Sequence, residues 1–159
     1  MSTLSENMNA PTFTINRDGG SVIDTSKLIN PYIIYFYPKD DTPGCTKEAI
    51  EFSENSDFFV EHNITIIGIS RDTVEKHDKF IIKHNLKLIL GSDTSGVICE
   101  KFGVWVEKSM YGKKYMGIVR STFLISNNNT IQKIWHKVRV KGHVHEVIAV
   151  SKNLLNIED

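Results

Sequence analysis

The sequence predicts an α/β fold in which helices cover a central mixed β-sheet on both faces. Two apolar runs, at residues 32–37 and 64–69, are rich in β-branched side chains and are nearly continuous rather than alternating. Such runs are typical of central strands that are buried on both faces. Between them, apolar residues such as Phe52 and Phe59 recur at helical spacing, which predicts a crossover helix over residues 46–61.

The other elements follow from turn and cap residues. The Asp18-Gly19-Gly20 cluster predicts an N-terminal β-hairpin of residues 13–15 and 21–23, because glycine tolerates the positive φ of a tight turn. Cap residues at 70–73 precede a helix that we expect over residues 74–85. Further along the chain we expect a strand at 86–90, a short helix that Asp93 or Thr94 caps and that spans about Val97–Phe102, a β region at 117–125, a strand at 130–136 and a last helix from about His143.

This order of elements is that of a thioredoxin-like fold, in a single domain that spans residues 1–159. A chain of 159 residues and 18.1 kDa is long enough to build one such core. We expect the polar residues 1–9 to form a flexible tail and residues 108–114 to form a surface loop or hairpin.

Charge and cysteine content narrow the class of protein. The 19 basic and 19 acidic residues cancel, which argues against a polybasic surface for nucleic acid or membranes. Two cysteines are too few for a disulfide framework. The polar N-terminus has no features of a secretion signal, and the apolar runs are far shorter than the ~20 residues of a membrane span. We therefore expect a cytoplasmic location with reduced thiols.

One segment carries the residues of a reactive site. Residues 38–48 follow the first central strand and combine two prolines, a glycine and Cys45 at the start of the crossover helix. Reactive groups gather at this carboxyl end of strands in open α/β sheets. The free N–H groups and dipole of a first helical turn stabilise a thiolate, which is the nucleophilic form of cysteine. The alternative is that Cys45 only fills space in the core, but the polar and constrained loop around it favours the nucleophile.

Three motifs, in order along the chain, resemble a known family. The pattern Pro38-x-x-x-Thr42-x-x-Cys45 is similar to the signature of the peroxiredoxins. The fuller stretch 36–48 resembles their bacterioferritin comigratory protein branch, also called peroxiredoxin Q. Two later segments resemble the same branch, residues 110–123 and 138–143.

The resemblance implies a thiol peroxidase that reduces hydrogen peroxide and organic hydroperoxides without a metal or organic cofactor. Cys45 would be the peroxidatic cysteine, whose thiolate attacks the peroxide and becomes sulfenic acid. Thr42 would hydrogen-bond the thiolate and the peroxide, and Arg120 would hold the thiolate charge. Pro38 would shield the site from water, and Gly44 would bind substrate through its backbone N–H. Outside this resemblance, Arg120 reads as a solvated charge at a strand edge.

The role of the second cysteine, Cys99, stays open. Many members of the resembled branch carry a resolving cysteine five residues after the peroxidatic one, and others carry it on the following helix. This chain has Ile50 at the first position and no cysteine in residues 80–83 at the second. The apolar neighbours of Cys99 favour a packing role, and a disulfide with Cys45 needs Cα atoms within ~7 Å. We expect a one-cysteine cycle with an external thiol such as thioredoxin or glutathione, with resolution by Cys99 as the alternative.

A second class of function is compatible with the same residues. A protein that senses peroxide or binds a partner through oxidised Cys45 would need no turnover. The six histidines are scattered, and we expect no metal site. His62, His77 and His84 are interpreted as surface or capping residues. Because the resembled branch is often monomeric, we expect a monomer.

Overall fold

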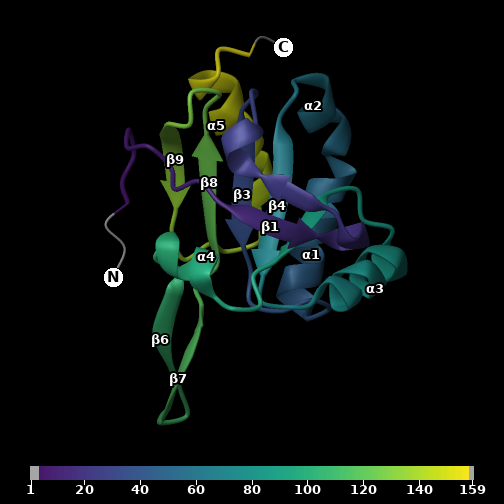
Figure 1. The fold of residues 1–159 in the computed structure, drawn as a ribbon, viewed down its shortest axis with the longest axis vertical. Helices are drawn as coiled ribbons and strands as arrows, with labels where there is room; N and C mark the ends of the chain where they lie inside the picture. Colours follow the sequence, from purple (N-terminus) through teal and green to yellow (C-terminus); the bar gives the residue numbers. More distant parts are fainter. Residues whose placement is uncertain (1–3, 158–159) are drawn as a thin grey trace.

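A computed structural model describes residues 4–157 and contains a seven-stranded mixed sheet with helices on both sides (Figure 1). The strand order is β2-β1-β5-β4-β3-β8-β9. Three central strands are parallel, β3 (Tyr32–Phe36), β4 (Thr65–Ser70) and β5 (Ile89–Ser92). β8 (Ser121–Ile125) runs antiparallel to β3, and β9 (Ile131–Trp135) antiparallel to β8. The α/β class with a mixed sheet, predicted from the sequence, is confirmed.

The N-terminal hairpin is also confirmed. β1 (Thr14–Arg17) pairs antiparallel with β2 (Val22–Asp24) through a short 3-10 turn that contains Gly19 at φ 81° and Gly20 at φ 92°. A second 3-10 turn, η2 (Thr25–Lys27), follows the hairpin. β1 adds antiparallel to β5, so the hairpin extends the sheet beyond its parallel strands.

The sheet separates two hydrophobic layers, because successive side chains of a strand point to opposite faces. Ile34 and Phe36 of β3 belong to one layer, together with α4 (Val97–Lys101); we call this the α4 side. Ile33 and Tyr35 belong to the other, which we call the α1 side. Four helices cover the α1 side, α1 (Pro43–Glu54), α2 (Ser56–Glu61), α3 (Val74–His84) and α5 (His143–Leu154).

The crossover from β3 to β4 consists of two helices, so the prediction of one helix over residues 46–61 is wrong. α1 begins earlier, with Pro43 in its first turn, where a missing N–H costs nothing. The helix is interrupted at Asn55, which has φ −102° and ψ 15°. The Asn55 side chain donates to the carbonyl of Glu51 at 2.8 Å and so competes with the backbone for helical bonds.

Two other boundaries differ from the expectation. The strand expected at 86–90 is β5 at Ile89–Ser92, because Asn85 at φ 51° and the bond from Leu86 N to Ile81 O complete the end of α3 instead. The β region expected at 117–125 is two strands, and residues 119–120 connect them. α4 begins at Val97, and Asp93 caps it as expected, because its side chain accepts from Ile98 N at 3.2 Å and from Cys99 N at 2.8 Å.

Residues 105–118 form a hairpin that projects from the body of the molecule (Figure 1). β6 (Trp105–Met110) and β7 (Lys113–Ile118) pair antiparallel through Tyr111 and Gly112, whose φ values of 52° and 78° suit a tight hairpin turn. Of the two possibilities expected for residues 108–114, the hairpin is therefore the one observed.

The expected N-terminal tail is bound along β9. Asn7 N donates to Ile131 O at 2.8 Å, and Ala10 N donates to Asn129 O at 2.9 Å. Part of the segment expected to be a tail is thus hydrogen-bonded to the sheet, and residues 1–3 lie outside the described part of the chain. None of the helices within residues 4–157 combines the length and apolar character needed to cross a membrane.

Candidate active site

Cys45 lies in the first turn of α1, at the carboxyl end of β3, as predicted. Its side chain packs into the α1 side of the sheet, and the residue is only 2% exposed. The turn closes when Thr46 N donates to Thr42 O at 2.8 Å. The sulfur therefore lies at a helix end whose free N–H groups favour an anion.

Arg120 brings a positive charge to this sulfur from a distant part of the chain. It occupies the two-residue connection between β7 and β8, and its carbonyl accepts from Val138 N at 2.8 Å. The guanidinium Nη2 donates to Cys45 Sγ at 3.3 Å, and Nη1 donates to Glu48 Oε1 at 2.7 Å. A planar guanidinium can hold both partners at once, so Glu48 orients the group that stabilises a thiolate.

Burial opposes the charges of this pair. Burial raises the pKa of Glu48 to about 7, although Arg120 offsets part of that rise. For Arg120, burial alone would lower the pKa, but the neighbouring Glu48 and Cys45 raise it above its ordinary value. Glu48 is completely buried, and its second oxygen, Oε2, has no hydrogen-bond partner in the described residues.

Gly44 leaves room for the guanidinium. A Cβ built at this position would lie 3.3 Å from Arg120 Nη2, closer than most side-chain contacts allow. The absence of a side chain at Gly44 therefore permits the approach of Arg120 to Cys45.

Thr42 and Pro38 lie in the same loop, and neither forms a hydrogen bond with the Cys45 sulfur in the described residues. Thr42 Oγ1 donates to the carbonyl of Lys39 at 2.9 Å. In this arrangement the Thr42 oxygen is left as a hydrogen-bond acceptor, and the expected bond to a thiolate would need the hydroxyl to turn away from Lys39. Pro38 is exposed at the surface of the loop.

Cys99 lies on the α4 side, across the sheet from Cys45. It is completely buried, and its N–H donates to Asp93 Oδ2 at 2.8 Å. Burial and Asp93 raise the pKa of the Cys99 thiol, which disfavours its nucleophilic form. The structure therefore does not bring the two cysteines together, and both are free thiols.

Three residues of this region were missed by the sequence reasoning or misplaced by it. Glu48 follows Cys45 by three residues, so helical spacing alone could have placed both on one face of α1. His77, interpreted as a surface or capping residue, is completely buried, and that interpretation is wrong. Burial and the charge of Arg120 lower the pKa of His143 to about 4, and its Nε2 lies 2.8 Å from Thr122 Oγ1.

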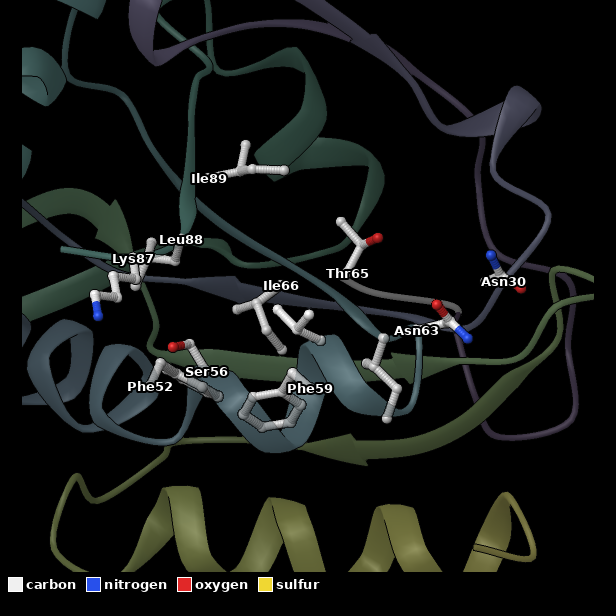
Figure 2. Close-up of a pocket in the computed structure, with 12 residues that line it drawn as sticks. Asn30, Phe52, Ser56, Phe59, Asn63, Thr65, Ile66, Lys87, Leu88 and Ile89 are labelled. Atoms are coloured by element: carbon white, nitrogen blue, oxygen red, sulfur yellow. The ribbon is translucent and has the colours of Figure 1, made fainter.

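A separate hollow of about 320 Å³ lies at the other end of α1. Figure 2 shows Phe52, Ser56 and Phe59 along one wall and Thr65, Ile66 and residues 87–89 along another. The side chains that line it include neither cysteine nor histidine.

Comparison with known proteins identifies close relatives. Residues 7–134 match the model of the AhpC/TSA family. The chain is 44% identical over 153 residues to peroxiredoxin Bcp of Bacillus subtilis strain 168, which covers 96% of this chain and 98% of that protein. Its structure is similar to that of the Xanthomonas campestris bacterioferritin comigratory protein, with a TM-score of 0.84, 39% identity and coverage of 89% and 90% of the two chains.

A crystal structure of a Xylella fastidiosa PrxQ variant is similar as well, with a TM-score of 0.86 and 35% identity. The match covers 94% of this chain and 98% of that one. The same arrangement of sheet and helices thus extends over nearly the whole chain, and the thioredoxin-like fold expected from the sequence is confirmed.

Proposed function

Because the chain belongs to the AhpC/TSA family and is a peroxiredoxin, a thiol peroxidase, we propose that Cys45 is the residue that reduces the peroxide. The observation that carries this proposal is the contact of 3.3 Å between Arg120 Nη2 and Cys45 Sγ. It joins a helix N-terminus and a fixed cation at one sulfur, and both favour the thiolate.

In the proposed reaction, the Cys45 thiolate attacks one oxygen of the peroxide, and the O–O bond breaks. The sulfur becomes sulfenic acid, while the other oxygen leaves as hydroxide or alkoxide and takes up a proton to become water or an alcohol. Negative charge moves from the sulfur onto the departing oxygen during this step. Arg120 and the backbone N–H groups near Gly44 stabilise that charge, because donors fixed in advance do not have to reorganise.

Two loop residues have supporting roles in this proposal. Thr42 accepts a hydrogen bond from the O–H of the bound peroxide, since its own hydroxyl donates to the carbonyl of Lys39. Pro38 covers the site and limits the access of water. The substrates are hydrogen peroxide and organic hydroperoxides; the Xanthomonas campestris relative is associated with alkyl peroxide reduction.

We also propose that an external thiol completes the cycle. The thiol sulfur displaces water from the sulfenic acid and forms a mixed disulfide with Cys45, and a second thiol then releases the reduced enzyme. The position of Cys99 supports this, because the strands of the sheet lie between the two cysteines. Thioredoxin and glutathione are the candidate reductants, and the enzyme acts as a monomer in the cytoplasm.

The test compares Cys45→Ser and Cys99→Ser proteins with the parent. We expect Cys45→Ser to abolish peroxide consumption and Cys99→Ser to retain it with an added thiol. After one equivalent of peroxide, the intact mass of the reduced parent should increase by one oxygen. A mass that instead decreases by two hydrogens indicates a Cys45–Cys99 disulfide and contradicts the one-cysteine cycle.

The same experiment separates turnover from sensing. With excess thiol present, an enzyme continues to consume peroxide, whereas a sensor stops after one equivalent. A Cys45→Ser protein that keeps its peroxidase activity would contradict the assignment of Cys45 itself.

A further inference from the structure

Four lysines line a hollow of about 230 Å³ beside the loop that precedes Cys45. This loop, residues 38–42, leads from β3 into α1, and it forms the hollow together with one side of α3. The four lysines, which we call the lysine face, are all exposed: Lys39, Lys76, Lys79 and Lys83. The last three lie on one side of α3, because residues three, four or seven positions apart in a helix share a side. Positive charge is thus concentrated at one place in a chain whose net charge is zero.

Two of the three carboxylates in the hollow are buried and are bonded to groups other than lysine. Asp40 Oδ2 lies 2.6 Å from His77 Nδ1, and Asp40 Oδ1 accepts from the hydroxyl of Tyr37 at 2.5 Å. Asp72 Oδ2 accepts from Asp40 N at 2.8 Å and from the hydroxyl of Ser70 at 2.7 Å. The hydrogen bonds of both carboxylates are therefore directed into the protein and not toward the lysine face.

The third carboxylate, Asp41, pairs with only one lysine of the face. Asp41 Oδ2 accepts from Lys83 Nζ at 2.7 Å, and Asp41 Oδ1 lies 2.9 Å from His84 Nε2. Within residues 4–157, no carboxylate lies within ion-pair distance of the other three lysines, Lys39, Lys76 and Lys79. Three exposed ammonium groups of the lysine face thus remain for the carboxylates of another molecule.

The width of the lysine face and its place in the fold favour a protein as that molecule. Lys76 and Lys83 are separated by about 10 Å along α3, and Lys39 adds a cation from the loop. Lys39 lies six residues before Cys45, but Cys45 does not line the hollow. A ligand small enough to fill the hollow would therefore not touch the sulfur, whereas a protein is wide enough to contact the lysine face and approach Cys45 in one complex.

We propose that the lysine face is the docking surface for a dithiol protein with acidic residues around its reactive cysteine, and that this protein reduces oxidised Cys45. The inference rests on the proposed role of Cys45 and on the proposed cycle with an external thiol. Carboxylates of the partner meet the ammonium groups of Lys39, Lys76 and Lys79. Opposite charges attract the two proteins before contact and orient them, so the lysine face acts mainly on the rate of association.

The chemical steps in the docked complex are two thiol exchanges. A thiolate of the partner attacks the sulfur of the Cys45 sulfenic acid, and an S–S bond forms as the S–O bond breaks. The hydroxide that leaves takes up a proton and becomes water. The second thiolate of the partner then attacks the partner's own sulfur in this mixed disulfide, which releases Cys45 as a thiolate and leaves the partner oxidised to a disulfide.

The experiment compares the parent with a double variant, Lys76→Glu with Lys79→Glu. Turnover of hydrogen peroxide is measured with two reductants, a thioredoxin of net negative charge that thioredoxin reductase and NADPH keep reduced, and dithiothreitol, which is small and uncharged. We expect the ratio of the thioredoxin kcat/KM to the dithiothreitol rate to fall by about tenfold in the double variant, through a higher KM for thioredoxin. In the parent, the same ratio should fall as the salt concentration rises, and this dependence should be much weaker in the variant.

Two controls separate docking from other effects of the substitutions. Lys76→Arg with Lys79→Arg keeps the charge and should keep the ratio of the parent. Lys113→Glu with Lys114→Glu makes the same change of charge at exposed positions of the β6–β7 hairpin and should also leave the ratio unchanged.

A selective loss of thioredoxin-dependent turnover that depends on salt supports the docking surface. Equal losses with both reductants, an equal loss in the hairpin control, or a ratio in the parent that salt does not change would overturn it. A lysine-dependent preference for glutathione over thioredoxin would also contradict the proposal, because it would assign the hollow to a small anionic thiol. Failure of the proposed function is distinguishable, because it would appear as peroxidase activity that survives Cys45→Ser.

Discussion

Arg120 illustrates how a single side chain joins two environments at the residue scale. One nitrogen of its guanidinium faces the sulfur of Cys45, and another faces a carboxylate that is completely buried. The buried Glu48 fixes the guanidinium plane, but at the cost of removing a carboxylate from water. The geometry of the site thus depends on a group whose charge is disfavoured by its surroundings.

This leads to a prediction about pH and Glu48. Its pKa of about 7 in the folded protein exceeds the ordinary value of 4.5, so the folded state holds this proton more strongly than the unfolded state. The contribution of the Glu48 proton to the free energy of unfolding is complete below pH 4.5 and is lost as the pH rises through 7. Relative to Glu48→Gln, the free energy of unfolding of the parent should fall across this range by up to about 3 kcal/mol.

Urea unfolding of both proteins at about pH 5 and about pH 8 checks this expectation. Glu54→Gln, at an exposed position of the same helix, is the matched control. Parallel pH profiles for the parent and Glu48→Gln would show that burial does not govern this carboxyl.

At the scale of elements, the pairing of β3 with β4 depends on a glycine. Tyr35 lies opposite Gly68 in the parallel register. A Cβ built at Gly68 would be 2.6 Å from Tyr35 Cζ, so the ring rests directly over the glycine. The ring is also stacked against Phe52 of α1, with centroids 4.7 Å apart. The absence of a side chain at Gly68 therefore leaves room in β4 for the Tyr35 ring, which packs against α1, the helix that carries Cys45.

We expect Gly68→Ala to destabilise the protein by about 1–3 kcal/mol, because the Tyr35 ring is confined and overpacking a core costs about this much. Gly91→Ala is the matched control in the neighbouring strand. Its added methyl group meets mainly the flexible end of Ile15, whose Cδ1 lies at 2.7 Å. Chemical denaturation should show the smaller loss for Gly91→Ala, and equal losses would contradict the role assigned to Tyr35.

The elements that sequence predicts well are those with strong periodicity or a rigid turn. The central strands, the hairpin at Gly19 and α3 with its N-cap at Thr73 agree closely with expectation. The interruption at Asn55 was not predictable from apolar spacing, because Phe59 continues the helical pattern beyond the break. The apolar pattern predicts the helical spacing well. It does not show that the side chain of Asn55 hydrogen-bonds a backbone carbonyl that would otherwise belong to the helix.

The candidate site likewise contains features that the sequence predicted and features that it did not. The motif around Cys45 and the position of Arg120 came from resemblance, and the structure places the two in contact. The burial of His77 depends on a contact with Asp40, 37 residues away in the chain, which no local pattern encodes. Contacts that depend on the packing of α3 against the loop became visible only in three dimensions.

At the scale of the whole molecule, each side of the sheet contains a tryptophan. Trp135 is buried in the α1 side, and Trp105 packs against the α4 side, with the guanidinium of Arg71 4.5 Å from its ring centroid. Because the two layers share the same strands, neither can lose its packing without exposing the other. We therefore propose that the chain folds as one domain.

The single remaining tryptophan in each of Trp105→Phe and Trp135→Phe tests this. In each variant, the fluorescence transition should coincide with the loss of secondary structure measured by circular dichroism. Separate midpoints for the two signals within one variant would indicate that the two sides unfold independently.

The burial of Cys99 also lets its reaction with a thiol reagent report how often the α4 side of the sheet opens. In a Cys45→Ser protein it is the one thiol of the chain, and it lies completely buried on the α4 side. A thiol reagent can modify it only in molecules whose α4 side has opened, so its labelling rate measures how often that happens. Cys99, to which no chemical role is assigned, would thus report local opening of the native protein without any attached probe.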